Sequence, residues 1–202
     1  MAQWLAATPL VLASRSRARQ KLLAAAGIPL EIDPPDLDER ALEAHAPSPA
    51  PEAVARHLAR EKAKAAAARR PGRLTLGADQ TLAFGTERFS KPADPAAARM
   101  QLEALRGRSH ELHSAFAFVR DDKVLFDYVG VARLTMRAFS DGFLDAYLDA
   151  AGLAATESVG AYQLEGLGSQ LFERVDGDYF TVLGLPLLQA LDFLRREGCL
   201  AS

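Results

Sequence analysis

Cysteine is almost absent from this 202-residue chain, in which Cys199 is the only one. A single cysteine excludes an internal disulfide framework and a zinc site built from several cysteines. Long apolar runs are absent as well, since none approaches the roughly 20 residues of a membrane span. No basic region precedes an apolar stretch in residues 1–13. We therefore expect a cytoplasmic protein that does not contact membranes.

A surplus of charge of one sign is also lacking. Lys and Arg number 24 against 26 Asp and Glu, for a formal net charge of −2. This balance argues against a general nucleic-acid coat protein, although it allows one local pocket for a small anion. Arg69, Arg70 and Arg73 leave a nucleic-acid-binding module as an alternative, but no platform of basic and aromatic residues accompanies them.

Apolar residues make up 49% of the chain and charged residues 25%, the mix of an ordinary globular domain. Strands and helices are predicted to alternate, which indicates an α/β or α+β fold with a mixed sheet and a single domain over residues 1–202. Strands are predicted at 9–13, 30–32, 74–76, 82–84, 88–90, 110–120, 123–137, 171–175 and 179–183. Helices are predicted between the capping positions 16–27, 94–107 and 140–152, and over 51–69 and 186–196.

The first polar loop follows a predicted buried strand and precedes a helix. It contains Ser14, Ser16 and Arg19, and Ser16 is the expected N-cap. Unpaired backbone N–H groups at a helix start favour an anion, and hydroxyl groups and arginine are good phosphate contacts. The Gly-Lys-Ser/Thr ending of a Walker loop is absent. A capped helix with a solvated basic face is the alternative, and for this segment alone it is the better interpretation.

Two carboxylates are candidates for chemistry. Asp79 is expected to end an apolar strand, beside the small residues Gly77 and Ala78, where a side chain is accessible. Capping a turn after the strand is the alternative role for Asp79. Glu39 lies in an acidic loop, where a solvated surface charge is the ordinary interpretation.

Three further charged residues are weak candidates on their own. Lys62 follows Leu58 by one helical turn, Lys91 precedes the rigid Pro92, and Glu165 stands among glycines. Lysines are usually surface residues, and glycines also make ordinary turns. Taken together, however, carboxylates that can hold a divalent metal and cations that can hold a polyphosphate suit attack of water on a nucleotide phosphate.

Seven pieces in a fixed order make the sequence similar to the Maf family of nucleoside triphosphate pyrophosphatases. Each piece is short, and the ordered set covers nearly the whole chain. The pieces are LASRSRARQKLL (12–23), DLDE ending at Glu39, LAREKA (58–63), GADQT (77–81), SKP (90–92), LRGRSH (105–110) and VGAYQLEGLGSQLFERVDGDYFTVLGLPL (159–187).

The resemblance implies a two-lobed fold, similar to that of inosine triphosphatases, with a central cleft, and often a homodimer. It implies hydrolysis of a nucleoside triphosphate to monophosphate and pyrophosphate with Mg²⁺ or Mn²⁺, a house-cleaning activity on nucleotide pools. In the family pattern Asp79 is the proton acceptor and binds the metal together with Glu39. The substrate-binding positions fall on Ser14, Ser16, Arg19, Lys62 and Lys91.

Base preference is predicted from three positions. The branch of the family that acts on dTTP and UTP has Arg, Thr and Gln where this chain has Ala18, Gln80 and Glu165. Gln80 and Glu165 are similar instead to the branch that acts on 7-methyl-GTP, although that branch has an aromatic residue in place of Ala18. We therefore expect 7-methyl-GTP as the favoured substrate. The alternatives are a dTTP/UTP-type pyrophosphatase and a non-catalytic nucleotide-binding regulator of cell division.

Overall fold

The computed structural model describes residues 3–201, which divide into two compact units. The first unit contains residues 3–80, 114–130 and 184–201, and the second contains residues 81–113 and 131–183. The predicted α/β architecture with a mixed sheet is confirmed. Seven strands pair in the order β2-β1-β3-β5-β6-β7, with β4 attached to β3.

The first unit begins with a β-α-β segment. Strands β1 (Leu10–Ala13) and β2 (Leu30–Ile32) are parallel and are connected by helix α1 (Arg17–Ala25). The predicted N-cap is confirmed, because the Ser16 hydroxyl accepts a hydrogen bond from the backbone N–H of Arg19. On its other side β1 runs parallel to β3 (Leu74–Phe84), with Ala13 paired to Gly77. The loop after β1 is therefore placed beside the middle of β3.

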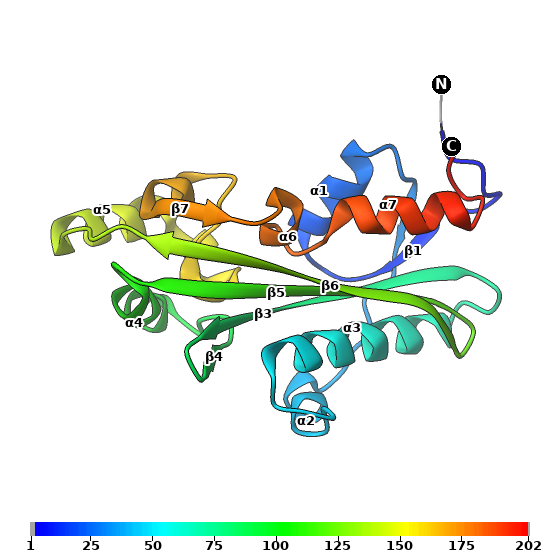
Figure 1. Ribbon diagram of the computed structural model, residues 1–202, viewed down its shortest axis with the longest axis horizontal. Helices are drawn as coiled ribbons and strands as arrows, with labels where there is room; N and C mark the ends of the chain where they lie inside the picture. Colours follow the sequence, from blue (N-terminus) through cyan, green and yellow to red (C-terminus); the bar gives the residue numbers. More distant parts are fainter. Residues whose placement is uncertain (1–2, 202) are drawn as a thin grey trace. The chain divides into compact units, whose positions relative to one another are not determined.

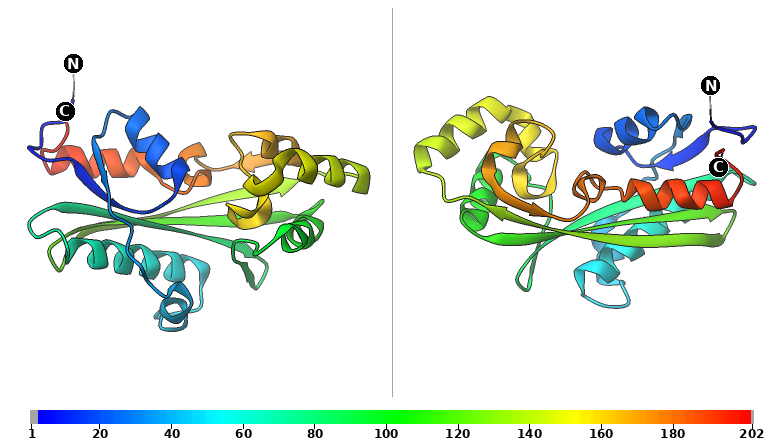
Figure 2. Two further views of the ribbon diagram at one scale, coloured as in Figure 1. Left: turned by 180° about the vertical axis from the view of Figure 1, so that it is seen from behind. Right: turned by 45° about the horizontal axis from the view of Figure 1, so that its top comes forward.

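Helices cover both faces of the sheet in the first unit (Figures 1 and 2). Helices α2 (Glu39–Ala44) and α3 (Pro51–Ala67) lie on one face, and α1 and α7 (Leu187–Arg196) lie on the other. Alanines of α3 pack against small side chains of β5 (Ser109–Arg120) and β6 (Lys123–Met136). On the α7 side the Phe193 ring stacks on Phe118 and Phe126, with centroids 4.5 and 5.3 Å away. The small α3 residues let this helix approach the sheet closely.

The second unit has its own apolar core, which includes Leu82, Leu102, Leu134 and Leu144. It is built on the hairpin of β3 and β4 (Glu87–Phe89) and on the antiparallel pair of β6 and β7 (Phe172–Asp176). The remaining elements are helices α4 (Pro95–Leu105), α5 (Asp141–Ala151) and α6 (Tyr179–Val182), and short 3-10 turns at Gly152–Thr156, Val159–Ala161 and Leu167–Leu171.

Three local predictions are wrong. Residues 179–183 were expected to form a strand, but they contain α6, which Asp178 caps by accepting hydrogen bonds from the Thr181 N–H and hydroxyl. Asp79 does not end a strand, because β3 continues through it to Phe84. Glu39 does not lie in a loop, because Asp38 caps α2 and makes Glu39 its first residue. In the two helical cases a local side-chain cap determines the conformation.

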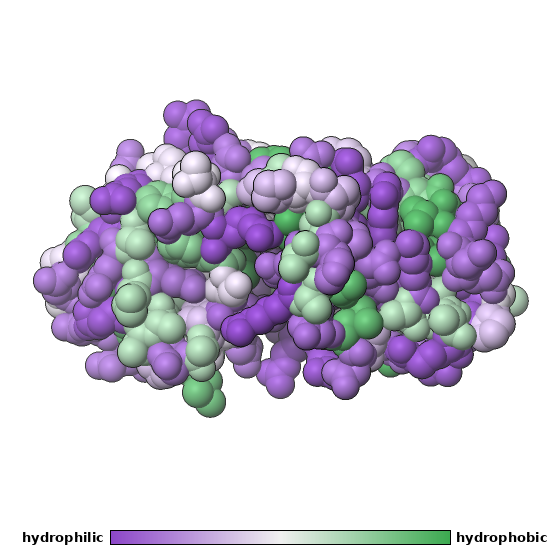
Figure 3. All heavy atoms as spheres, turned by 90° about the horizontal axis from the view of Figure 1, so that it is seen from below, coloured by the Kyte–Doolittle hydropathy of each residue, from purple (hydrophilic) through white to green (hydrophobic). Residues whose placement is uncertain are grey.

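The surface carries mixed charge and scattered apolar side chains. Figure 3 shows one face on which hydrophilic residues predominate and apolar residues form small separate areas. Across residues 3–201, no helix combines the length and apolar character needed to cross a bilayer.

The arginines considered for nucleic-acid binding form ion pairs with two acidic residues at β2 and directly after it. Arg69 pairs with Asp33, Arg70 with Asp33 and Glu31, and Arg73 with Glu31. These pairs offset most of the positive charge of the cluster.

Candidate active site

The Lys62 ammonium group lies between two carboxylates in the first unit. Its Nζ is 2.7 Å from Oδ1 of Asp79 and 2.9 Å from Oε1 of Glu39. The Lys62 and Asp79 side chains are only 12% and 10% exposed, whereas Glu39 is 54% exposed. The three residues come from α3, β3 and α2, so the fold brings together side chains that lie far apart in the sequence.

A close approach between β3 and α3 produces this cluster. Gly77 has no side chain, and a Cβ atom built there would lie 2.2 Å from the Ala59 carbonyl oxygen and 2.5 Å from the Ala63 nitrogen. Only glycine therefore allows the strand to lie this close to the helix backbone. Asp79 follows Gly77 by two residues, so its side chain leaves the strand on the same face and meets Lys62 of that helix.

Arg19 is a buried cation that connects the first loop to β3. Its Nε donates to the Gly184 carbonyl at 2.8 Å, and its Nη1 donates to the Ala78 carbonyl at 2.9 Å and to the Ser14 hydroxyl at 3.2 Å. Burial lowers the pKa of the Arg19 guanidinium, while the negative charges of Asp79 and Glu39 oppose that shift. Arg19 thus holds the backbone next to Asp79 and adds positive charge near both carboxylates.

Ser14 and Ser16 order the loop that precedes α1. The Ser14 hydroxyl accepts hydrogen bonds from the Ser16 N–H and from Arg19, both at 3.2 Å. The helix start therefore lies beside the strand that carries Asp79, as phosphate binding at this loop requires.

Of the three positions predicted to set base preference, two lie in the first unit. The half-buried Ala18 lies on α1, and Gln80 follows Asp79 and donates to Ser114 at 2.8 Å.

Lys91 and Glu165 belong to the second unit. Lys91 is exposed and follows β4, where the buried Pro92 anchors the chain behind it. Glu165 is exposed in a tight turn that is closed by a hydrogen bond from the Gly166 N–H to the Gln163 carbonyl. The structure brings Glu39, Lys62 and Asp79 together within one unit. Convergence of Lys91 and Glu165 with them stays a prediction.

The donor set of this site fits a divalent cation. Within residues 3–201 there is no group of three or more His, Cys, Asp or Glu residues arranged to hold a metal ion. Two carboxylates that meet at one cationic group nevertheless suit Mg²⁺, which proteins commonly bind through one or two carboxylates together with water and substrate phosphate oxygens. Glu39 and Asp79 are the residues that would hold it.

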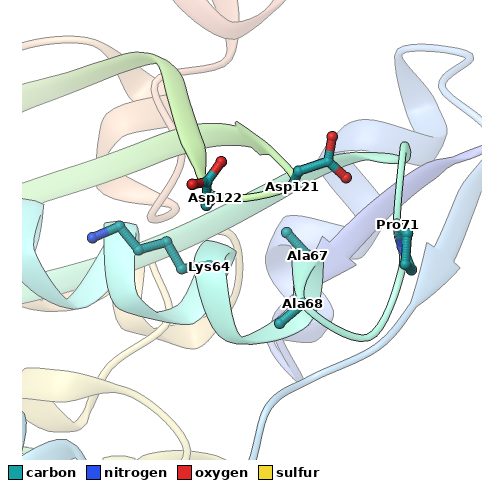
Figure 4. A pocket seen from close by; sticks show the side chains of 6 residues that line it. All are labelled: Lys64, Ala67, Ala68, Pro71, Asp121 and Asp122. Carbon is teal, nitrogen blue, oxygen red and sulfur yellow. The ribbon is translucent and has the colours of Figure 1, made fainter.

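A separate cavity of about 540 Å³ lies at the C-terminal end of α3. It is lined by Ala67, Ala68 and Pro71, with Lys64, Asp121 and Asp122 around them (Figure 4). None of these is a predicted site residue. Three of the six lining residues are charged, but Lys64 pairs with Glu61, Asp121 accepts a hydrogen bond from the Gly72 N–H, and none of the lining residues belongs to the cluster of Glu39, Lys62 and Asp79.

Sequence analysis missed several residues that build the site. Ala59 and Ala63 permit the approach of α3, and Gly184 accepts the hydrogen bond from Arg19 at a backbone φ of +92°. The spacing of Ala59 and Ala63 by four residues places them on one helix face, and Gly77 and Asp79 share one strand face. The helical and strand periodicities were visible in the sequence. The contact between this face of the helix and this face of the strand was not.

A mixed α/β sheet with opposed carboxylates and cations beside a helix start is the framework of a phosphate-handling enzyme, and the comparisons with known proteins agree. The family model described as Maf-like protein matches residues 9–197, and the chain belongs to this family. A protein of Rhodopseudomonas palustris (strain ATCC BAA-98 / CGA009), named nucleoside triphosphate pyrophosphatase, is 55% identical over 201 residues and covers 100% of both chains. The protein of Mesorhizobium japonicum named 7-methyl-GTP pyrophosphatase is 51% identical over 193 residues, which are 95% of this chain and 97% of that protein.

Proposed function

We propose that this chain hydrolyses a nucleoside triphosphate between its α- and β-phosphates, releasing the nucleoside monophosphate and pyrophosphate in the cytoplasm. The observation that carries the proposal is the meeting of Glu39 and Asp79 at the Lys62 ammonium, beside the start of α1. The names of full-length relatives at 51–55% identity support the same reaction. A regulator that only binds nucleotides would not need the two carboxylates in this arrangement.

In the proposed reaction Asp79 orients a water molecule towards the α-phosphorus and accepts its proton. The water oxygen forms the new bond to phosphorus, and pyrophosphate leaves with the electron pair of the broken P–O bond. Lys62, Lys91 and the N–H groups at the start of α1 neutralise the phosphates, and Arg19 keeps the strand beside Asp79 in place. A divalent cation, when bound by Glu39 and Asp79, supplies further positive charge to the phosphate oxygens. Stabilisation of charge is the main source of rate enhancement in such reactions.

The test is pyrophosphate release from a panel of canonical and methylated nucleoside triphosphates, with Mg²⁺, with Mn²⁺ and with a chelator. We expect release of pyrophosphate that requires a divalent cation, with the highest kcat/KM for 7-methyl-GTP. No release from any member of the panel would favour the non-catalytic regulator. A preference for dTTP and UTP would retain the reaction and replace the substrate.

The preference for 7-methyl-GTP is proposed to depend on Glu165. A carboxylate can accept hydrogen bonds from guanine N1–H and N2–H₂, and it attracts the positive charge of a 7-methylguanine ring. Support comes from the Gln80 and Glu165 pair and from the name of the Mesorhizobium japonicum relative.

Glu165→Gln is expected to lower kcat/KM for 7-methyl-GTP relative to GTP by roughly tenfold, because the guanine N–H groups are common to both substrates and only 7-methyl-GTP loses the attraction between the carboxylate and its positive ring. The measurement is the ratio of the two kcat/KM values in both proteins. Glu173→Gln, which changes an exposed glutamate of β7 in the same unit, is the matched control. An unchanged ratio in Glu165→Gln would remove this residue from base recognition.

A further inference from the structure

The position of Lys62 has a consequence for metal binding. Its ammonium group is in hydrogen-bond contact with one oxygen of each carboxylate that would hold a divalent cation. Carboxylate oxygens are the preferred ligands of Mg²⁺ and Mn²⁺. Lys62 and a divalent cation therefore compete for Glu39 and Asp79.

Charge balance strengthens this competition. Glu39 and Asp79 carry two negative charges, and Lys62 and Arg19, which interact with them, carry two positive charges. The cluster is thus neutral on its own. A divalent cation added alone would leave two uncompensated positive charges at a site where Asp79 and Arg19 are buried, which is costly. A triphosphate supplies the negative charge that removes this cost.

We propose that Lys62 is an internal counter-cation, which hinders divalent-cation binding at Glu39 and Asp79 until a nucleoside triphosphate is bound. The phosphates then draw the flexible Lys62 side chain away from the carboxylates. Lys62 thus balances the carboxylate charge in the nucleotide-free protein and the phosphate charge in the nucleotide-bound protein. Because binding free energies are linked, metal and nucleotide each tighten the binding of the other. This inference rests on the proposed function, which makes a triphosphate the ligand of the site.

Titration of the nucleotide-free protein with Mn²⁺, followed by the electron paramagnetic resonance signal of free Mn²⁺, tests the inference. Lys62→Met removes the ammonium group and keeps an unbranched side chain. We expect the Kd for Mn²⁺ to fall by about tenfold or more, where tenfold corresponds to about 1.4 kcal/mol. Adding Glu39→Gln to Lys62→Met should reverse the gain, because one of the two carboxylates is then lost.

Lys64→Met is the matched control. It removes the same charge from the same helix, but Lys64 pairs with Glu61 and is not part of the cluster. Equal Mn²⁺ affinity in Lys62→Met and Lys64→Met would overturn the inference. The wild-type protein provides an independent test if Lys62→Met does not fold. After Mn²⁺ binding to the α,β-methylene analogue of GTP has been measured without protein and subtracted, the Kd of the protein for Mn²⁺ should fall when the analogue is present, and no fall beyond that binding would also overturn the inference.

Failure of this inference differs from failure of the proposed function. The nucleotide-free titration requires no turnover, so a Kd that falls in Lys62→Met would support the counter-cation role even if no pyrophosphate were released. Conversely, pyrophosphate release by the wild-type protein together with an unchanged Mn²⁺ Kd in Lys62→Met would retain the enzyme and refute the counter-cation.

Discussion

Asp79→Asn is expected to lower kcat by roughly 10²-fold or more, the scale of a positioned general base. The amide keeps the shape of the side chain but cannot accept the proton of the attacking water. It also removes one of the two carboxylates that meet at Lys62. The measurement is steady-state pyrophosphate release with saturating substrate and divalent cation.

Asp127→Asn is the matched control for this prediction. Asp127 is also a largely buried aspartate of the first unit, and it pairs with Arg56 and Arg60 away from the cluster. The same chemical change there removes an ion pair and should leave kcat close to that of the wild type. Near-normal turnover in Asp79→Asn would exclude Asp79 as the base.

The free energy of unfolding is expected to decrease by about 2.5 kcal/mol between about pH 7 and about pH 4.5 because of His110 alone. Burial lowers the pKa of His110 to about 4, and its Nε2 lies 2.7 Å from the Tyr162 hydroxyl. The histidine of the unfolded chain has the ordinary, higher pKa and takes up a proton first as pH falls. The stabilisation is therefore complete above the unfolded pKa and is lost as pH falls from there towards 4.

Denaturant unfolding at a series of pH values measures this effect. His110→Gln should flatten the pH dependence over that interval, because the titrating group is gone. His45→Gln, which changes an exposed histidine at the end of α2, should leave the dependence as in the wild type. A slope in His110→Gln equal to that of the wild type would show that His110 does not titrate between these limits.

Local signals predicted the elements that begin and end at strong capping residues. Ser16 and Gly27 bound α1 as expected, and Asp94 with Pro95 starts α4. The same logic was available at Asp178, whose side chain caps α6, but the run Tyr-Phe-Thr-Val favours a strand by composition. The helix forms instead of a strand because the Asp178 carboxylate accepts hydrogen bonds from both the N–H and the hydroxyl of Thr181 in the first helical turn.

Asp79 illustrates the limit of strand assignment from hydrophobic runs. Polar residues at 79–81 suggested that the strand had ended, whereas β3 extends over Leu74–Phe84. These polar side chains have partners on neighbouring elements. Asp79 forms an ion pair with Lys62, and Gln80 donates a hydrogen bond to Ser114. A buried polar residue is tolerated within a strand when such a partner exists, and the partner is distant in the sequence.

The chemistry proposed for the site comes from the sequence alone: the residue types, their order along the chain and their agreement with the Maf family predicted a carboxylate-and-lysine site for a nucleotide. The contacts among them depended on the tertiary structure. The absence of a side chain at Gly77 matters only because Ala59 and Ala63 of α3 lie against it, and this approach sets Lys62 between Glu39 and Asp79. Periodicity determines which face a side chain occupies, but which two faces meet is decided by packing of the whole unit.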